Sequence, residues 1–219
     1  MLPVETIIFD WDGTLARTLD MWIDGYHAAF RRRSLSFSAA EIVAEFFHEH
    51  DRVPARHPQL NFPVIADEAR AHVREAAGRV ALYDGAAEAL TALAARGIRL
   101  ALVTSSPRAT LDAGLAAHGL HRHFASVLAG DDGFGHKPDP LPFTETLRRL
   151  GARAAATLVI GDSHVDILAG HAAGCRTCLF APSDNALFHD HARLRGLGPD
   201  HDIADLAELL QHAAPAGRL

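Results

Sequence analysis

The sequence predicts an α/β protein with a parallel sheet, helices on both faces and a helical segment inserted after the first strand. Five short apolar or β-branched runs are predicted to be buried strands, at residues 6–9, 99–103, 126–129, 157–160 and 176–180. From residue 86 onward strand and helix patterns alternate, as in a parallel sheet whose strands are joined by helical crossovers. Functional residues are therefore expected just after the strands.

The helical patterns between the later strands each end close to a glycine. The predicted helices cover residues 86–95, 109–118, 142–150 and 165–173. The glycines that follow are Gly97, Gly119, Gly151 and Gly174. Glycine readily adopts the left-handed conformation that ends many helices, so these positions support the predicted helix ends.

Residues 16–83 lack strand patterns and are predicted to form a small helical domain. Helices are expected over residues 17–32, 39–48 and 65–78. Pro54, Pro58 and Pro63 are expected to break any helix between the last two and to leave an irregular loop.

The position of this helical region divides the chain into two predicted domains. Residues 1–15 and 84–219 would form the α/β core domain, and residues 16–83 the inserted domain. Hinges are expected near Ala16-Arg17 and Tyr83-Asp84-Gly85.

Composition excludes several classes of protein. The 219 residues include 21 Lys+Arg and 27 Asp+Glu, for a net charge of −6, which disfavours a nucleic-acid groove. No apolar run approaches the roughly 18 residues of a membrane span. Two cysteines cannot form a disulfide scaffold, and no charged and then apolar leader follows Met1, so a cytoplasmic protein is expected. The sequence does not distinguish a monomer from a homodimer.

Two carboxylates follow the first strand, in the segment Asp10-Trp11-Asp12-Gly13-Thr14. They point the same way from an extended backbone, so they repel each other unless a cation joins them. Magnesium suits such a pair because it binds carboxylate and phosphate oxygens, and Gly13 allows a tight turn. The alternative is an ordinary solvated Asp/Gly turn.

Hydroxyl groups follow the second strand, in the segment Thr104-Ser105-Ser106-Pro107. Ser106 is predicted to cap the next helix and Pro107 to occupy its first position. The free amides and hydroxyls at such a helix start bind anions, so Thr104 and Ser105 are candidate phosphate ligands. Ordinary helix capping is the alternative.

Lys137 is the only lysine among the 21 basic residues. It lies in the segment Gly135-His136-Lys137-Pro138, beyond the third strand. An ammonium group is a compact charge that can neutralise crowded carboxylates and phosphate, where a guanidinium does not fit the same space. Lys137 is therefore a candidate phosphate ligand.

Two more carboxylates, Asp162 and Asp166, follow the fourth strand. Asp162 stands at the strand end, where it would face the cation. Ser163 and Asp166 also resemble a capping box in which Asp replaces the usual Glu. Asp166 can serve both the helix start and the cation site.

These four motifs, taken in order, resemble those of the haloacid dehalogenase superfamily of phosphotransferases. Asp10-x-Asp12-Gly13-Thr14 is the most specific motif, and residues 16–83 are similar to the superfamily's helical cap of the first type. The resemblance covers nearly the whole chain. It implies a Rossmann-like core with an inserted α-helical cap domain.

The resemblance also implies a mechanism. Asp10 would attack phosphorus to form an aspartyl-phosphate, while Asp12 would protonate the leaving oxygen and then activate water. Mg²⁺ would be held by the Asp10 side chain, the Asp12 carbonyl and Asp162, and Asp166 would support these ligands. The implied phosphate-binding residues are Gly13, Thr104, Ser105 and Lys137.

The pattern is similar to phosphoglycolate-phosphatase-like hydrolases, so the expected substrate is a small phosphorylated metabolite. Dehalogenases lack the second aspartate of the first motif, so Asp12 disfavours carbon–halogen cleavage. Phosphonoacetaldehyde hydrolases use a cap lysine, and residues 16–83 contain none. A phosphosugar mutase of the same superfamily stays open, because it differs in whether water or a sugar hydroxyl accepts the phosphoryl group.

A non-catalytic protein that binds phosphorylated ligands, or a receiver-like signalling protein, is the alternative from another class. A receiver would carry its phosphoacceptor after the third strand, where this chain has Gly130-Asp131-Asp132. The long insert and the two aspartates after the first strand disfavour this alternative.

Two further groups of residues have ordinary explanations. Arg17, Arg52 and Arg56 are candidate substrate contacts, although arginine is the chain's default cation and solvated arginines are the alternative. His50-Asp51 and the cluster His189-Asp190-His191 suggest a metal site built on His-Asp pairs, but the two groups have no helical spacing to one another and are predicted to be solvated surface.

Overall fold

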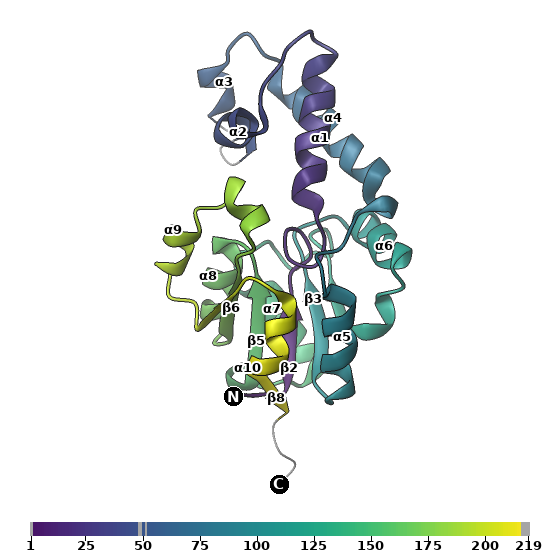
Figure 1. Ribbon diagram of the computed structural model, residues 1–219, viewed down its shortest axis with the longest axis vertical. Coiled ribbons are helices and arrows are strands. Elements are labelled where there is room, and N and C mark those ends of the chain that lie inside the picture. The colour runs from purple at the N-terminus through teal and green to yellow at the C-terminus, as the bar shows by residue number, and fades with distance from the viewer. Residues whose placement is uncertain (1, 48–49, 51, 216–219) are drawn as a thin grey trace.

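In the part of the chain that the structure describes, six parallel strands form the central sheet, in the order β4-β3-β2-β5-β6-β7 (Figure 1). The computed structural model describes residues 2–47, 50 and 52–215. The strands are β2 (Thr6–Phe9), β3 (Arg99–Val103), β4 (Ser126–Leu128), β5 (Thr157–Gly161), β6 (Arg176–Phe180) and β7 (His201–Ile203). All five predicted strands are confirmed, with ends within one residue.

The sequence did not predict three short strands. The edge strand β7 has three residues, two of them polar, so no apolar run marks it. Near the chain ends, β1 (Leu2–Val4) and β8 (Ala213–Pro215) form a separate parallel pair. Pairing between strands so far apart in sequence leaves no local pattern.

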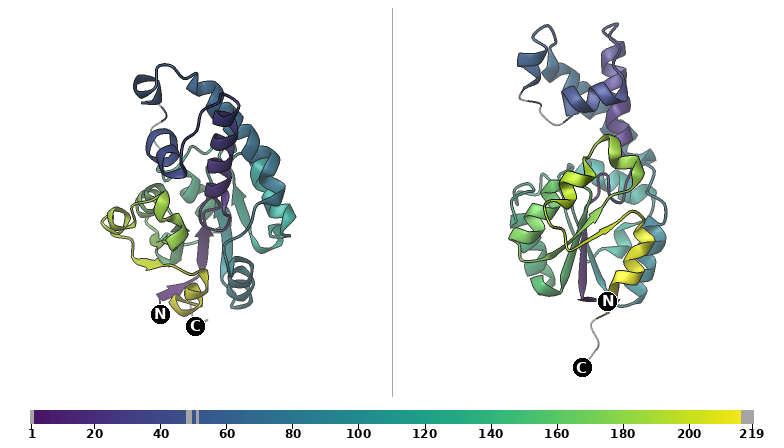
Figure 2. Two further views of the ribbon diagram at one scale, coloured as in Figure 1. Left: turned by 45° about the horizontal axis from the view of Figure 1, so that its top comes forward. Right: turned by 60° about the vertical axis from the view of Figure 1, so that its left-hand side comes forward.

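Alternate residues of the central strands point to opposite faces of the sheet. Ile7 and Phe9 belong to one hydrophobic cluster, which includes residues of helices α5 (Ala86–Ala95) and α6 (Arg108–Ala117). Ile8 belongs to another, which includes residues of α7 (Leu141–Leu150) and α8 (His164–Ala172). Helices therefore cover both faces (Figure 2), which explains why the strands are continuous apolar runs.

The helices of the core agree with the sequence prediction. Helices α5 to α8 begin and end within one residue of the predicted bounds, and the four glycines that follow them have φ angles between +57° and +79°. Two shorter helices, α9 (His191–Arg195) and α10 (Leu209–His212), come later in the chain. Among the described residues, no helix combines the length and apolar character needed to cross a membrane.

The segment between β2 and α5 folds into helices around a hydrophobic cluster of its own. Tyr26, Phe30, Phe46 and Phe62 lie at its centre, with ring centroids 4.9–6.4 Å apart. This helical insert rises above the carboxyl ends of the strands (Figure 1). Its elements are α1 (Thr18–Arg31), α2 (Ala39–Ile42), a π-helix (Val43–Phe47), α3 (Val53–Arg56) and α4 (Phe62–Ala76).

Two of the three prolines of the helical insert begin helices rather than break them, whereas Pro58 lies in the turn between α3 and α4. The prediction of one irregular loop is wrong, because Pro54 lies in the first turn of α3 and Pro63 in the first turn of α4. A proline at this position loses only an N–H that has no partner within the helix. The helix predicted over residues 39–48 consists of α2 and the π-helix, and His48 lies outside the described residues.

The two chain segments that connect the helical insert to the sheet lie side by side. The Arg17 N–H donates to the Ala81 carbonyl at 2.9 Å, and the Tyr83 N–H donates to the Leu15 carbonyl at 3.0 Å. The predicted hinge segments thus form one short two-stranded connection.

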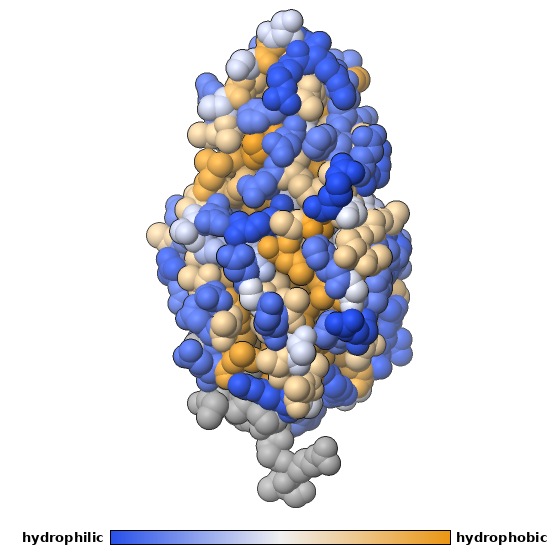
Figure 3. Space-filling view, turned by 45° about the vertical axis from the view of Figure 1, so that its right-hand side comes forward, coloured by the Kyte–Doolittle hydropathy of each residue, from blue (hydrophilic) through white to orange (hydrophobic). Residues whose placement is uncertain are grey.

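The segment that follows β6 bridges the sheet and the helical insert (Figure 2). Its Phe188 packs in the hydrophobic cluster of the insert, with its ring centroid 5.4 Å from that of Phe47. On the face shown in Figure 3, hydrophilic residues are spread over both parts of the molecule, with hydrophobic residues in small groups between them.

Candidate functional site

Asp10, at the end of β2, and Asp166, in the first turn of α8, flank the single lysine of the chain. The Lys137 Nζ lies 2.7 Å from Asp10 Oδ1 and 2.6 Å from Asp166 Oδ1, and no more than 8% of any of the three side chains is exposed. The Ser163 hydroxyl donates to Asp166 Oδ2 at 2.9 Å, within the predicted capping box, which is confirmed. Both oxygens of Asp166 therefore have a donor.

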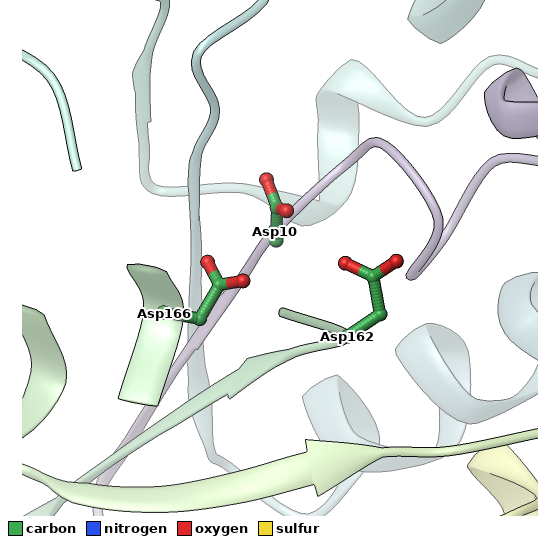
Figure 4. A group of neighbouring side chains, drawn as sticks. All are labelled: Asp10, Asp162 and Asp166. Atoms are coloured by element: carbon green, nitrogen blue, oxygen red, sulfur yellow. The ribbon is translucent and has the colours of Figure 1, made fainter. Parts of the chain in front are cut away.

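Asp162 completes a group of three buried acids at the strand ends. Oxygens of Asp10, Asp162 and Asp166 lie within 4.8 Å of one another. One oxygen of Asp162 faces the other two acids, and the other oxygen is turned away (Figure 4). The close packing requires glycine at position 13, because a β-carbon on Gly13 would lie 2.0 Å from Asp162 Oδ2.

Burial dominates the electrostatics of this group. Loss of contact with water raises the pKa of Asp10 well above its ordinary value, and the charge of Lys137 offsets only part of this effect. Burial also raises the pKa of Asp162, which a hydrogen bond from His189 partly opposes. Burial alone would lower the pKa of Lys137, but the neighbouring carboxylates of Asp10 and Asp166 more than compensate and raise it.

The donor set fits a hard divalent cation. Lys137 contacts two of the three acids, so a further positive charge would help to keep Asp10 and Asp162 ionised. Magnesium accepts oxygen ligands from one or two carboxylates. Because both oxygens of Asp166 are already hydrogen-bonded, Asp10 and Asp162 are the acids best placed to bind such an ion directly.

The Asp12 carboxylate is bound by two hydroxyl groups instead. Thr104 donates to Asp12 Oδ2 at 2.9 Å and Ser106 donates to the same oxygen at 2.8 Å. The Ser106 N–H in turn donates to Thr104 Oγ1 at 3.0 Å. The prediction that Ser106 caps the next helix is wrong: Pro107 is the N-cap, and the Ser106 hydroxyl binds the carboxylate.

The other predicted phosphate ligands lie in tight backbone turns at the same edge of the sheet. Gly13 has a φ of +72°, and its N–H donates to a carbonyl of its own turn at 2.9 Å. Ser105 is exposed, and its carbonyl lies so close to Gly130 that a β-carbon there would be 2.2 Å away. Phosphate binding by Gly13, Thr104, Ser105 and Lys137 stays a prediction.

Two residues of the segment after β6 were missed as site residues. The prediction that His189 is solvated surface is wrong, because only 12% of its side chain is exposed and its Nε2 donates to Asp162 Oδ2 at 2.9 Å. Asn185 is 1% exposed, and its Nδ2 lies 3.4 Å from the same oxygen. One signal was available, since both follow a predicted strand, where functional residues are expected.

Two of the candidate substrate arginines contact other side chains of the protein. Arg17 Nη1 lies 2.7 Å from Asp184 Oδ2, and Arg56 Nη1 lies 3.9 Å from Glu45 Oε2. The structure thus gives both of them protein partners. Substrate contacts of these residues and of Arg52 stay predictions.

The two acids that a receiver-like protein would use after the third predicted strand have a structural role here. Asp131 Oδ1 accepts the Arg108 N–H at 2.7 Å. Asp132 ion-pairs with the Arg108 guanidinium and accepts the Ala129 N–H at 3.0 Å. Both acids hold the loop after β4 against the start of α6, which disfavours the receiver-like alternative.

Comparison with known proteins identifies the family of this chain. Residues 7–180 match the haloacid dehalogenase-like hydrolase family, and the chain belongs to it. The resemblance that the four motifs indicated is thereby confirmed, as is the Rossmann-like α/β core.

Relatives of this chain extend over most of its length. It is 34% identical over 190 residues to a phosphoglycolate phosphatase of Cupriavidus necator, with 81% of each chain covered. It is 29% identical over 217 residues to the pyrophosphatase PpaX of Oceanobacillus iheyensis, with 95% of this chain and 96% of the relative covered. A crystal structure of a HAD family hydrolase from Deinococcus radiodurans, with bound phosphate and sodium, superimposes with a TM-score of 0.80 at 25% identity, covering 95% of this chain and 94% of the other.

Proposed function

We propose that this protein is a magnesium-dependent phosphatase that hydrolyses a small phosphomonoester through an aspartyl-phosphate on Asp10. The observation that carries the proposal is the buried group of Asp10, Asp162 and Asp166 around Lys137, at the carboxyl ends of parallel strands. Phosphoryl transfer needs this combination of a nucleophile and concentrated positive charge. The names of the two relatives, a phosphoglycolate phosphatase and a pyrophosphatase, also support it.

In the first half of the reaction, an oxygen of Asp10 attacks phosphorus and the bond from phosphorus to the ester oxygen breaks. Protonated Asp12 gives its proton to the leaving oxygen. The hydroxyls of Thr104 and Ser106 support this role, because both bind Oδ2 and so fix the orientation of the carboxyl group. Lys137 neutralises negative charge beside Asp10.

In the second half, the Asp12 carboxylate takes a proton from water, whose oxygen attacks phosphorus and breaks the bond to Asp10. Free phosphate leaves and both aspartates return to their starting states. Asp10, Asp162 and the Asp12 carbonyl would hold Mg²⁺, which when bound supplies positive charge that stabilises the phosphoryl oxygens. The ion pair of Asp166 with Lys137 keeps the ammonium group beside Asp10.

We also propose that residues 16–83 form a cap domain and that residues 1–15 and 84–219 form the core domain. The separate hydrophobic cluster of the helical insert and its two adjacent connecting segments support this division. A cap above the strand ends would limit the access of water during transfer and would contact the substrate.

The first test compares release of p-nitrophenol from p-nitrophenyl phosphate by wild type, Asp10→Asn and Asp67→Asn, with Mg²⁺ and with EDTA. Asp67 is the matched control because it lies on the surface of the helical insert, with 71% of its side chain exposed. Wild type and Asp67→Asn are expected to turn over only with Mg²⁺. Asp10→Asn should lose at least about 1,000-fold in turnover, because the nucleophile is removed.

Phosphorus NMR then identifies the acceptor of the phosphoryl group. With phosphoglycolate, pyrophosphate and a hexose phosphate as substrates, a phosphatase releases inorganic phosphate. A mutase would instead move the phosphoryl group to another hydroxyl of the sugar and release no inorganic phosphate.

In the first test, substantial turnover of p-nitrophenyl phosphate by Asp10→Asn would refute the assignment of Asp10 as the nucleophile.

A further inference from the structure

The side chain of Asn185 uses all of its hydrogen-bonding groups inside the site. Its Nδ2 donates to the Gly13 carbonyl at 2.8 Å and lies 3.4 Å from Asp162 Oδ2, and its Oδ1 accepts the hydroxyl of Tyr83. Asn185 is 1% exposed, so water cannot replace these partners. The three contacts join the segment after β6 to the turn after β2, to the end of β5 and to the segment before α5.

The chemistry of the partners fixes the orientation of the Asn185 amide. A backbone carbonyl and a carboxylate oxygen can only accept, so the NH₂ group must face Gly13 and Asp162. The amide oxygen then faces Tyr83, whose hydroxyl must donate. Reversing the amide would set oxygen against two acceptors.

The contacts with His189 and Asn185 together fix which oxygen of Asp162 faces the other acids. His189 Nε2 and Asn185 Nδ2 both bind Oδ2, at 2.9 Å and 3.4 Å. The oxygen that faces Asp10 and Asp166 is then the one available to a cation (Figure 4). Side chains that orient a metal ligand in this way tune the affinity for the metal without touching it.

Tyr83 connects this arrangement to the helical insert. It lies in the segment that returns from the insert to the sheet, and its ring packs edge-on against Phe180, with centroids 5.1 Å apart. The Arg17 guanidinium, in the outgoing segment, lies 4.6 Å from the centre of the Tyr83 ring and ion-pairs with Asp184, the residue before Asn185. Both connecting segments therefore hold the part of the chain that carries Asn185.

We propose that Asn185 is a positioning residue that orients Asp162 for the cation, and that Tyr83 on the connecting segment holds Asn185 in place. The inference rests on the proposed function, because it requires Asp162 to bind a divalent ion. In this arrangement, the affinity for the ion depends on the contact between the sheet and the segments that connect it to the helical insert.

The chain offers a matched pair of variants for the test, because Tyr83 and Tyr26 are its only two tyrosines. Tyr83→Phe removes the hydroxyl and keeps the ring on Phe180. Tyr26→Phe makes the same change inside the helical insert, where the hydroxyl lies 3.3 Å from the Phe46 carbonyl. Asn185→Ala removes the proposed positioning group itself.

Binding of Mn²⁺ to the metal-free full chain is measured by electron paramagnetic resonance, with Mg²⁺ as competitor and the Tm of each variant recorded. The dissociation constant is expected to rise about tenfold in Asn185→Ala and about fivefold in Tyr83→Phe, and to stay unchanged in Tyr26→Phe. For Tyr83→Phe, the Mg²⁺ concentration that gives half-maximal turnover should rise in parallel. Saturating Mg²⁺ should restore its kcat and its KM for p-nitrophenyl phosphate.

The outcomes separate this inference from the proposed function. If the wild type binds no Mn²⁺, the proposed function and the inference fail together. If the wild type binds Mn²⁺ and both Asn185→Ala and Tyr83→Phe bind it equally well, the inference is wrong while the metal site stands. Equal losses of affinity in Tyr83→Phe and Tyr26→Phe would also overturn it, because they would indicate a general loss of stability.

Discussion

Replacing Lys137 by methionine tests whether one buried cation holds the acid group together. Lys137 lies within 2.7 Å of both Asp10 and Asp166, and only 3% of its side chain is exposed. Methionine has a similar length but no charge, so it leaves two carboxylates close together in a buried site. Removing one partner of a buried ion pair costs about 3–5 kcal/mol of stability, and we expect that loss for Lys137→Met at pH 8.

The loss of stability in Lys137→Met should become smaller as the pH falls, and the direction of this change follows from the pKa of Asp10. Burial already raises the pKa of Asp10 above its unfolded value, and loss of Lys137 should raise it further. A carboxyl whose pKa is raised by folding takes up a proton when the chain folds. Stability is then greatest below the unfolded pKa and decreases as the pH rises through the folded pKa, by up to about 1.4 kcal/mol per pH unit for one proton.

Urea unfolding in EDTA at pH 5 and pH 8 measures both effects on wild type, Lys137→Met and Arg148→Met. Arg148 is the control cation, because it ion-pairs with Glu145 at 2.7 Å while 73% of its side chain is exposed. Arg148→Met should lose less than about 1 kcal/mol, equally at both pH values. Wild-type stability of Lys137→Met at pH 8, or the same loss at pH 5 and pH 8, would refute the reasoning.

Two further variants test the surroundings of Asp12 and the fold of the helical insert. Ser106→Ala removes one of the two hydroxyls that bind the Asp12 carboxylate. We expect about a tenfold lower kcat in a steady-state phosphatase assay, because a hydrogen bond to a charged group contributes about 1.5–3 kcal/mol. Glu68→Gln weakens the ion pair of Glu68 with Arg33, whose side chains are 26% and 28% exposed, so the loss at pH 7 should stay below about 1 kcal/mol. Hydrogen bonds from Arg33 lower the pKa of Glu68 from 4.5 to about 2. Thermal unfolding should therefore show that the wild type is more stable than Glu68→Gln above pH 4.5, and this difference should disappear as the pH falls toward 2.

Each of these expectations has a result that contradicts it. Ser36→Ala, at an exposed serine of the helical insert, is the control for the loss of a hydroxyl. An equal kcat in Ser106→Ala and Ser36→Ala would show that the Ser106 hydroxyl does not assist Asp12. A stability difference between wild type and Glu68→Gln that persists at pH 2 would show that the ion pair is not its source.

The elements of the core were predictable because both of their signals are local. Strands buried on both faces are continuous apolar runs, as in Thr157–Gly161, and the helices between them end at glycines with positive φ. The strand β7 and the prolines of the helical insert show the limits of these signals. Three residues at a sheet edge have no pattern, and a proline marks a helix start as readily as a break.

The candidate site was predictable as far as it follows the strands. Asp10, Lys137 and Asp162 come after strands or in the loops beyond them, and parallel strands bring their carboxyl ends to one edge of the sheet. Ser106 shows where this reasoning stops. Its sequence position fits a helix cap, but the structure places it beside a carboxylate 94 residues earlier in the chain, and a hydrogen bond to this charged group takes its hydroxyl.

The sequence by itself determined the fold class, the order of the motifs and the edge of the sheet at which the acids meet. Only the tertiary structure decided which side chains complete the site. Tyr83 and Asn185 are 102 residues apart, and Asn185 reaches back 172 residues to Gly13. Such contacts depend on the packing of whole elements and not on any local periodicity, so no sequence pattern marks them. Local patterns determine the helices and strands. Polar groups that packing then buries must form hydrogen bonds with one another, because water cannot reach them.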